Sequence, residues 1–110
     1  MAPVILALRS TQWAECRVLL SGQHRALLDQ TLEQFGVAAD YDLNLMEPGQ
    51  TLGRLTGTAF TRFDAALREL KPDFVLAQGD TTTAMVAALS CFYQEIPFGH
   101  VEAGLRTGNK

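Results

Sequence analysis

Two acidic side chains, Asp80 and Glu102, follow short apolar runs that have the character of buried strands. The first lies within QGDTTT and the second within GHVEAGLRTG. In a parallel sheet, neighbouring strands end at the same edge, so the two carboxylates could converge across one pocket. Paired carboxylates in a partly dehydrated cleft can serve as acid and base, because their pKa values are pushed apart.

The segment QGDTTT has the composition of a tight turn from a strand into a helix. Its glycine permits the turn, and Asp80 is a good N-cap with free helical N–H groups beyond it. Such an N-terminus, with the Thr81 hydroxyl beside it, is a natural seat for an anion or for sugar oxygens. The alternative is that Asp80 only caps the helix and the threonines are solvated.

The segment GHVEAGLRTG places a histidine, a carboxylate and an arginine within seven residues: His100, Glu102 and Arg106. Arg106 could hold a phosphate or a carboxylate with two parallel hydrogen bonds. The alternative is a structural ion pair between Glu102 and Arg106, with His100 satisfied in the core. Spacing alone leaves both interpretations open.

Two further segments carry candidate ligand groups. Gln23, His24 and Arg25 stand in SGQHR, a polar turn into a helix, where a histidine is otherwise a surface or capping residue. Gln50 lies in MEPGQT, which is either an ordinary loop with a helix cap or a ligand loop. Segments 21–25, 78–83 and 102–107 each leave a predicted strand at the ligand-binding edge.

Strands and amphipathic helices alternate along the chain, which predicts an α/β fold with a parallel sheet and right-handed crossovers. Gly36 is expected to end one helix, and Lys71-Pro72 is expected to end another. The strand at 73–77 is expected to be covered on both faces of the sheet. The periodicity predicts helices at 2–12, 25–35, 51–70 and 81–94, strands at 16–20, 73–77 and 97–101, an irregular stretch at 37–50 and a loop at 102–110.

The composition narrows the functional classes. The 110 residues suffice for one domain, and a net charge of -3 argues against a nucleic-acid partner. No apolar run approaches the roughly 18 residues that would span a membrane. Cys16 and Cys91 are expected to be buried free thiols rather than a disulfide, which indicates the reducing cytoplasm, and they have no metal-ligand spacing.

Taken together, four segments resemble the non-hydrolysing UDP-N-acetylglucosamine 2-epimerase family: SGQHRALLDQTLEQFG, YDLNLMEPGQTL, QGDTTT and GHVEAGLRTGNK. The resemblance implies two Rossmann-like, three-layer domains of the glycosyltransferase-B type, with the active site between them, in a cytoplasmic homodimer. It implies interconversion of UDP-N-acetylglucosamine and UDP-N-acetylmannosamine by elimination and re-addition of UDP, for surface-polysaccharide synthesis, without a cofactor or a metal.

By position, the resemblance makes Asp80 and Glu102 the acid/base residues and gives His100 and Arg106 supporting roles. Around the substrate pocket and an adjoining regulatory site it places Gln23, His24, Arg25, Gln50 and Thr81. It also implies that residues 1–110 are an incomplete N-terminal domain, without the family's first strand, its Gly-Thr-Arg-Pro-Glu turn and the second domain.

That incompleteness predicts an exposed strand edge and no epimerase activity from these residues alone. Three alternatives stay open. The sequence is also compatible with a hydrolysing epimerase, with a glycosyltransferase of the same fold, or with a non-catalytic remnant half-domain that binds a sugar nucleotide or another chain.

Overall fold

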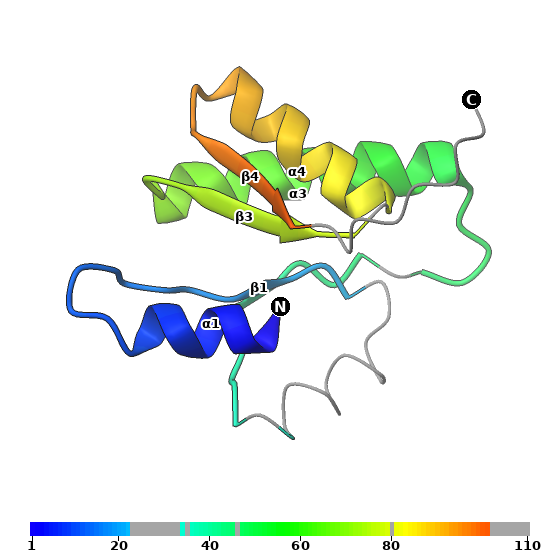
Figure 1. Ribbon diagram of the computed structural model, residues 1–110. Helices are drawn as coiled ribbons and strands as arrows, with labels where there is room; N and C mark the ends of the chain where they lie inside the picture. Colours follow the sequence, from blue (N-terminus) through cyan, green and yellow to red (C-terminus); the bar gives the residue numbers. More distant parts are fainter. Residues whose placement is uncertain (23–33, 35, 46, 80, 102–110) are drawn as a thin grey trace, which may run out of the picture.

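The structure is a computed structural model that describes residues 1–22, 34, 36–45, 47–79 and 81–101. Helices and strands alternate along most of this length, as predicted (Figure 1). The elements are α1 (Ala2–Arg9), β1 (Leu19–Leu20), β2 (Tyr41–Asp42), α3 (Leu52–Leu70), β3 (Val75–Gln78), α4 (Thr82–Tyr93) and β4 (Phe98–Val101). The predicted loop at 102–110 and nearly all of the predicted helix at 25–35 lie outside the described residues. Gly36 has a φ of 66°, the left-handed conformation expected of a helix-ending glycine.

The strands pair in parallel, which confirms the predicted α/β class. They form two pairs within the described residues, β1 with β2 and β3 with β4, rather than one continuous sheet. The backbone N–H of Val75 donates to Pro97 O at 3.0 Å, so Leu76, the next residue, turns its N–H and C=O to the opposite edge of β3. No described strand pairs with that edge of β3. Helix α3 connects the β1–β2 pair to the β3–β4 pair along the chain.

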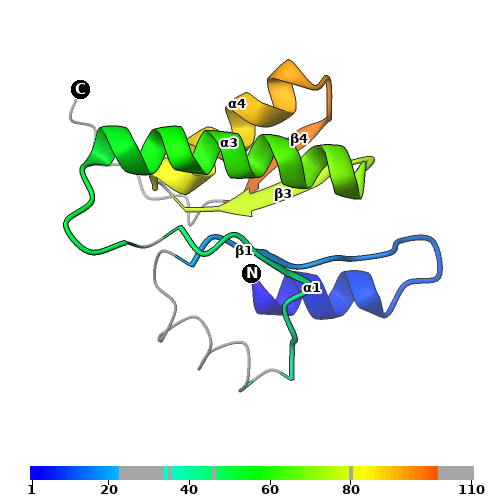
Figure 2. The same cartoon turned by 180° about the vertical axis from the view of Figure 1, so that it is seen from behind.

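Three layers follow from how the strand side chains alternate. Val18 and Leu20 pack with Ile5 of α1, whereas Leu19 between them packs against the cluster that α3 and α4 share. Figures 1 and 2 show the same order from both sides, with α1 on one side of β1 and the pair α3 and α4 on the other. The main core therefore lies between the strands and α3 with α4.

Helix α3 begins and ends where its sequence indicates. The Thr51 side chain accepts a hydrogen bond from the Arg54 N–H at 3.2 Å, and Lys71 closes the helix with a φ of 47° before Pro72. Its buried stripe is Leu55, Ala59, Phe63, Ala66 and Leu67. Leu52, in the first turn of the helix, lies outside that stripe and is 74% exposed.

Other expectations need correction. The stretch at 37–50 was predicted to be irregular, but it contains β2. α1 ends at Arg9 rather than at residue 12. The strand at 73–77 was expected to be covered on both faces, yet Phe74 is 55% and Leu76 39% exposed, because α4 packs on one face and no described helix covers the other.

Candidate functional site

The predicted site residues divide into two groups. Gln50, Thr81 and His100 are described by the structure. The other six lie outside the described residues, and their predicted roles stay predictions: Gln23, His24, Arg25, Asp80, Glu102 and Arg106. The described backbone nevertheless fixes the points at which the chain enters each of these segments.

The chain leaves β3 and β4 at adjacent points. Gly79, which precedes Asp80, donates its N–H to the carbonyl oxygen of Val101, which precedes Glu102, at 3.4 Å. Gly79 has a φ of 99°, a conformation that glycine adopts without strain. The two acidic residues therefore follow residues that are hydrogen-bonded to each other, in keeping with the predicted convergence.

A side-chain hydrogen bond also joins the ends of β3 and β4. His100 Nε2 donates to the carbonyl oxygen of Gly79, and since a carbonyl only accepts, Nε2 carries the proton. His100 is exposed, so the alternative of a histidine satisfied in the core is wrong. The imidazole thus ties the end of β4 to the turn between β3 and α4.

That turn leads into the N-terminus of α4. The N-cap is Thr81 rather than the predicted Asp80, and the Thr81 side chain makes no capping hydrogen bond. The first turn of α4 contains no acidic residue. Its backbone N–H groups thus present the positive end of the helix dipole, a favourable setting for an anion.

The ends of β1 and β2 are also held close together. The Ser21 carbonyl oxygen accepts from the Leu45 N–H at 2.9 Å. Gly22, with a φ of 80°, lies so close to the Asn44 backbone that an added Cβ would stand 3.1 Å from the Asn44 Cα. A glycine is therefore required where the chain enters the predicted ligand segment at 23–25.

Gln50 has an unused hydrogen-bond donor. Its Oε1 accepts from the Glu47 N–H at 3.4 Å, while its buried Nε2 has no hydrogen-bond partner. A buried amide donor without a partner carries a desolvation cost that a ligand acceptor would relieve. This observation favours the ligand-loop interpretation of the segment over the ordinary loop.

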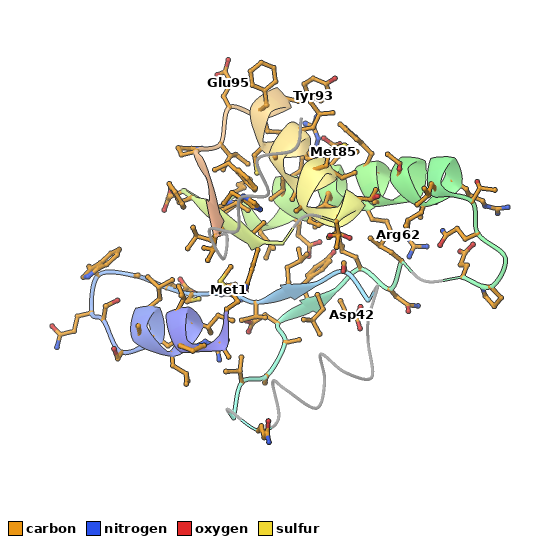
Figure 3. All side chains as sticks on the ribbon, turned by 45° about the vertical axis from the view of Figure 1, so that its right-hand side comes forward. Met1, Asp42, Arg62, Met85, Tyr93 and Glu95 are labelled. Carbon is orange, nitrogen blue, oxygen red and sulfur yellow. The ribbon has the colours of Figure 1, made fainter. Side chains whose placement is uncertain are left out.

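Sequence reasoning missed Arg62. Its Nη1 donates to the carbonyl oxygens of Leu43 at 2.6 Å and Asn44 at 2.7 Å, which fastens α3 to the segment after β2. Figure 3 shows this side chain reaching from α3 toward that segment. The sequence signal that could have revealed Arg62 is its position next to Phe63, which belongs to the buried apolar stripe of α3.

The described residues contain no group of three or more His, Cys, Asp or Glu side chains that could hold a metal ion. Cys16 and Cys91 are both free, as predicted, but only Cys91 is buried; Cys16 is half-buried, contrary to the prediction. Within the same part of the chain, no helix combines the length and apolar character needed to cross a membrane.

Parallel strands whose ends bring polar turns and a helix N-terminus together are typical of α/β proteins with a Rossmann-like arrangement. The family model described as UDP-N-acetylglucosamine 2-epimerase matches residues 6–110. The chain belongs to that family.

Individual relatives agree with this assignment. The chain is 50% identical to the UDP-N-acetylglucosamine 2-epimerase of Escherichia coli K12 over 109 residues, which is 99% of this chain and 29% of that protein. It is 47% identical to the Bacillus subtilis enzyme over 110 residues, again 29% of the relative. The chain thus spans under a third of the length of these relatives.

Solved structures show the same fold. The Neisseria meningitidis UDP-GlcNAc 2-epimerase bound to UDP-GlcNAc superposes with a TM-score of 0.88 at 50% identity, covering 99% of this chain and 30% of that one. The Methanocaldococcus jannaschii enzyme in complex with UDP-GlcNAc and UDP gives 0.86 at 32% identity, covering 98% and 30%. These matches confirm a partial glycosyltransferase-B-type α/β fold.

Proposed function

We propose that this chain supplies the acid/base half of an enzyme that interconverts UDP-N-acetylglucosamine and UDP-N-acetylmannosamine. The observation that carries the proposal is the family match over residues 6–110, which includes all four segments that hold the predicted site residues. Crystal structures of relatives hold UDP-GlcNAc or UDP, in keeping with this substrate class.

The reaction needs a proton to leave C2 of the sugar and the C1–O bond to UDP to break. A base removes the C2 proton, the electron pair forms a C1=C2 double bond, and UDP departs with the electrons of the C1–O bond. Re-addition of UDP to C1, with protonation of C2 from the opposite face, gives the epimer. Asp80 and Glu102 take the proton-transfer roles, since two acidic groups on opposite sides of C2 serve both directions.

The remaining predicted residues bind the substrate. The N-terminus of α4 with Thr81, together with Arg106, stabilises the charge that develops on the departing diphosphate. Gln50 offers its free Nε2 donor, and Gln23, His24 and Arg25 complete the pocket and a neighbouring regulatory site. His100 acts through Gly79, by fixing the turn that carries Asp80. The enzyme requires neither a cofactor nor a metal.

The same proposal covers assembly and location. The enzyme works as a homodimer in the cytoplasm, which suits the two free cysteines, and it serves surface-polysaccharide synthesis. Residues 1–110 form an incomplete N-terminal domain, and the active-site cleft is completed by a second domain.

A chimera tests the activity. Residues 1–110 replace the matching segment of the Escherichia coli relative, and the purified chimera is incubated with UDP-N-acetylglucosamine. We expect a mixture of the two UDP-sugars by chromatography, and no turnover by the 110-residue chain alone. Free UDP with N-acetylmannosamine from the chimera would indicate a hydrolysing enzyme instead, and turnover by the isolated chain would contradict the need for a second domain.

A further inference from the structure

Arg62 joins the middle of α3 to the turn that follows β2. Its Nη1 donates to Leu43 O at 2.6 Å and to Asn44 O at 2.7 Å. Leu43 and Leu45 are 5% and 0% exposed, so the turn is packed on the core at both sides of Asn44. Asn44 itself has a φ of 50°, a left-handed conformation that is uncommon for residues other than glycine. A charged donor on two successive carbonyl oxygens stabilises this turn.

The same turn is bonded to the entry of the predicted ligand segment at 23–25. The peptide group whose oxygen accepts the second bond from Arg62 donates its N–H, that of Leu45, to Ser21 O at 2.9 Å. Gly22 follows Ser21, and an added Cβ there would stand 3.3 Å from the Leu45 nitrogen. Hydrogen bonds in series polarise one another, so a charged donor at one end strengthens the next bond. Arg62 therefore acts on the start of segment 23–25 through a single peptide group.

Arg62 also fixes one end of the loop that carries Gln50. The loop begins at the carbonyl groups that Arg62 binds, and it returns to α3 at Thr51, whose side chain caps the helix. Both ends are thus attached to one rigid helix, at residues 51 and 62, about 16 Å apart along its axis. Within the loop, the buried Nε2 of Gln50 has no hydrogen-bond partner in the described part of the chain. Fixed ends hold this donor in place for a ligand acceptor.

The acidic residues of the proposed enzyme belong to the other strand pair. Asp80 and Glu102 follow β3 and β4, whereas Arg62 bonds to the turn after β2. Within the described residues, no strand pairing connects the two pairs. The contacts of Arg62 therefore lie on the binding side of the proposed site, apart from its proton-transfer side.

We propose that Arg62 is a positioning residue for the nucleotide-sugar substrate, which orders the entry to segment 23–25 and the Gln50 loop before the substrate binds. This inference rests on the proposed function, which supplies the substrate class. Without Arg62, the left-handed turn at Asn44 populates other conformations, and the substrate has to order it. The apparent affinity of a protein falls in proportion to the fraction that is competent to bind. The loss therefore falls on KM, while the turnover of bound substrate is retained.

Steady-state kinetics of the chimera test this role. Arg62→Met should raise the KM for UDP-N-acetylglucosamine about tenfold or more and should change kcat by less than about twofold. Arg62→Lys should recover part of the affinity, because one nitrogen makes both bonds and an ammonium group also has donors for two acceptors. An unchanged KM in Arg62→Met, or a lysine variant that is as impaired as the methionine variant, would overturn the proposal.

Arg68→Met separates positioning from a general loss of stability. Arg68 Nε donates to Asp64 Oδ2 at 3.0 Å, so this variant also removes an arginine hydrogen bond from α3. It does so nearly two turns beyond Arg62, towards the end of α3 that leads into β3. Its KM should stay within about twofold of the wild-type value. If Arg68→Met raised KM as much as Arg62→Met, KM would simply follow stability, and the positioning role would be wrong.

Hydrogen exchange gives a second readout, which does not depend on turnover. The Leu45 N–H lies in series with Arg62, whereas the Val75 N–H bonds to Pro97 O in the other strand pair. In the chimera, mass spectrometry should show that Arg62→Met speeds exchange at least about fivefold in peptides that contain Leu45. Peptides that contain Val75 should be unaffected.

This readout keeps the role of Arg62 distinct from the proposed function. An inactive chimera in which Arg62→Met speeds exchange at Leu45 would support the role of Arg62 in holding the turn and would count against the function. Unchanged exchange at Leu45 would overturn the proposal, whether or not the chimera epimerises its substrate.

Discussion

The carboxyl ends of β3 and β4 are held together by two hydrogen bonds at Gly79. Its N–H bonds to the Val101 carbonyl oxygen, and its own carbonyl oxygen accepts from His100. Asp80 and Glu102 follow Gly79 and Val101 directly in the sequence, so these two bonds hold together the points at which the chain enters the two acidic segments. His100 is thus a positioning residue in the proposed enzyme.

Replacing His100 tests that role. In the chimera, His100→Ala should lower kcat/KM about tenfold or more, because catalytic groups displaced by small distances lose much of their effect. The free energy of unfolding should fall by only about 1 kcal/mol, the value of one hydrogen bond. His100→Gln, which keeps an N–H donor, should recover part of the activity. Equal losses in both variants would argue against positioning through Gly79.

Asp64 makes stability depend on pH at the C-terminal end of α3 and α4. The hydrogen bond from Arg68, followed by the one from Gln94, lowers the pKa of Asp64 below its ordinary value of 3.8. A lowered folded-state pKa means that the carboxylate stabilises the fold above about pH 4 and that this contribution is lost as the pH falls through the lowered pKa. Wild type should therefore exceed Asp64→Asn in melting temperature at pH 7, and the gap should narrow as the pH falls below about 4. A gap that stays constant through acid titration would contradict this assignment.

At the scale of elements, α3 was predictable because all of its determinants are local. An apolar stripe, a threonine cap and Lys71-Pro72 gave its bounds to within one residue. β2 was not predictable, because its two residues are strand only by virtue of pairing with β1: the Tyr41 N–H donates to Val18 O at 3.1 Å, across 23 positions of sequence. Short strands of this kind carry little signal of their own.

The candidate site shows the same division between local and long-range determinants. The turn glycines at 22 and 79 were recognisable from their polar neighbours. The cap of α4 was placed one residue early, since Asp80 and Thr81 are both good caps and the backbone decides between them. Arg62 escaped notice, because its acceptors are backbone carbonyl oxygens about 18 residues away and have no side-chain signature.

Arg62 should matter for stability more than a typical surface arginine. Arg62→Met keeps most of the aliphatic length but leaves the carbonyl oxygens of Leu43 and Asn44 without their charged donor. We expect a loss of about 1–2 kcal/mol in the free energy of unfolding, measured by urea titration. Arg54→Met, an exposed position at the start of the same helix, should change it by less than about 0.5 kcal/mol. Similar losses for the two would contradict the role given to Arg62.

At the scale of the whole molecule, the two strand pairs share one core but no strand-to-strand pairing within the described residues. The chain covers 29% of the Escherichia coli relative, and the edge of β3 at Leu76 pairs with no described strand. Under the proposed function, this part of the fold contributes the proton-transfer groups and one wall of the substrate cleft.

The most direct test of that central claim follows the C2 proton. The chimera is incubated with UDP-N-acetylglucosamine in deuterated water, and deuterium at C2 is measured by NMR. Wild-type residues 1–110 should give exchange together with epimerisation, and Asp80→Asn and Glu102→Gln should each reduce both by at least about a hundredfold. Asp73→Asn, an exposed acidic residue at the opposite end of β3, should have no effect. Undiminished exchange in both Asp80→Asn and Glu102→Gln would contradict the account.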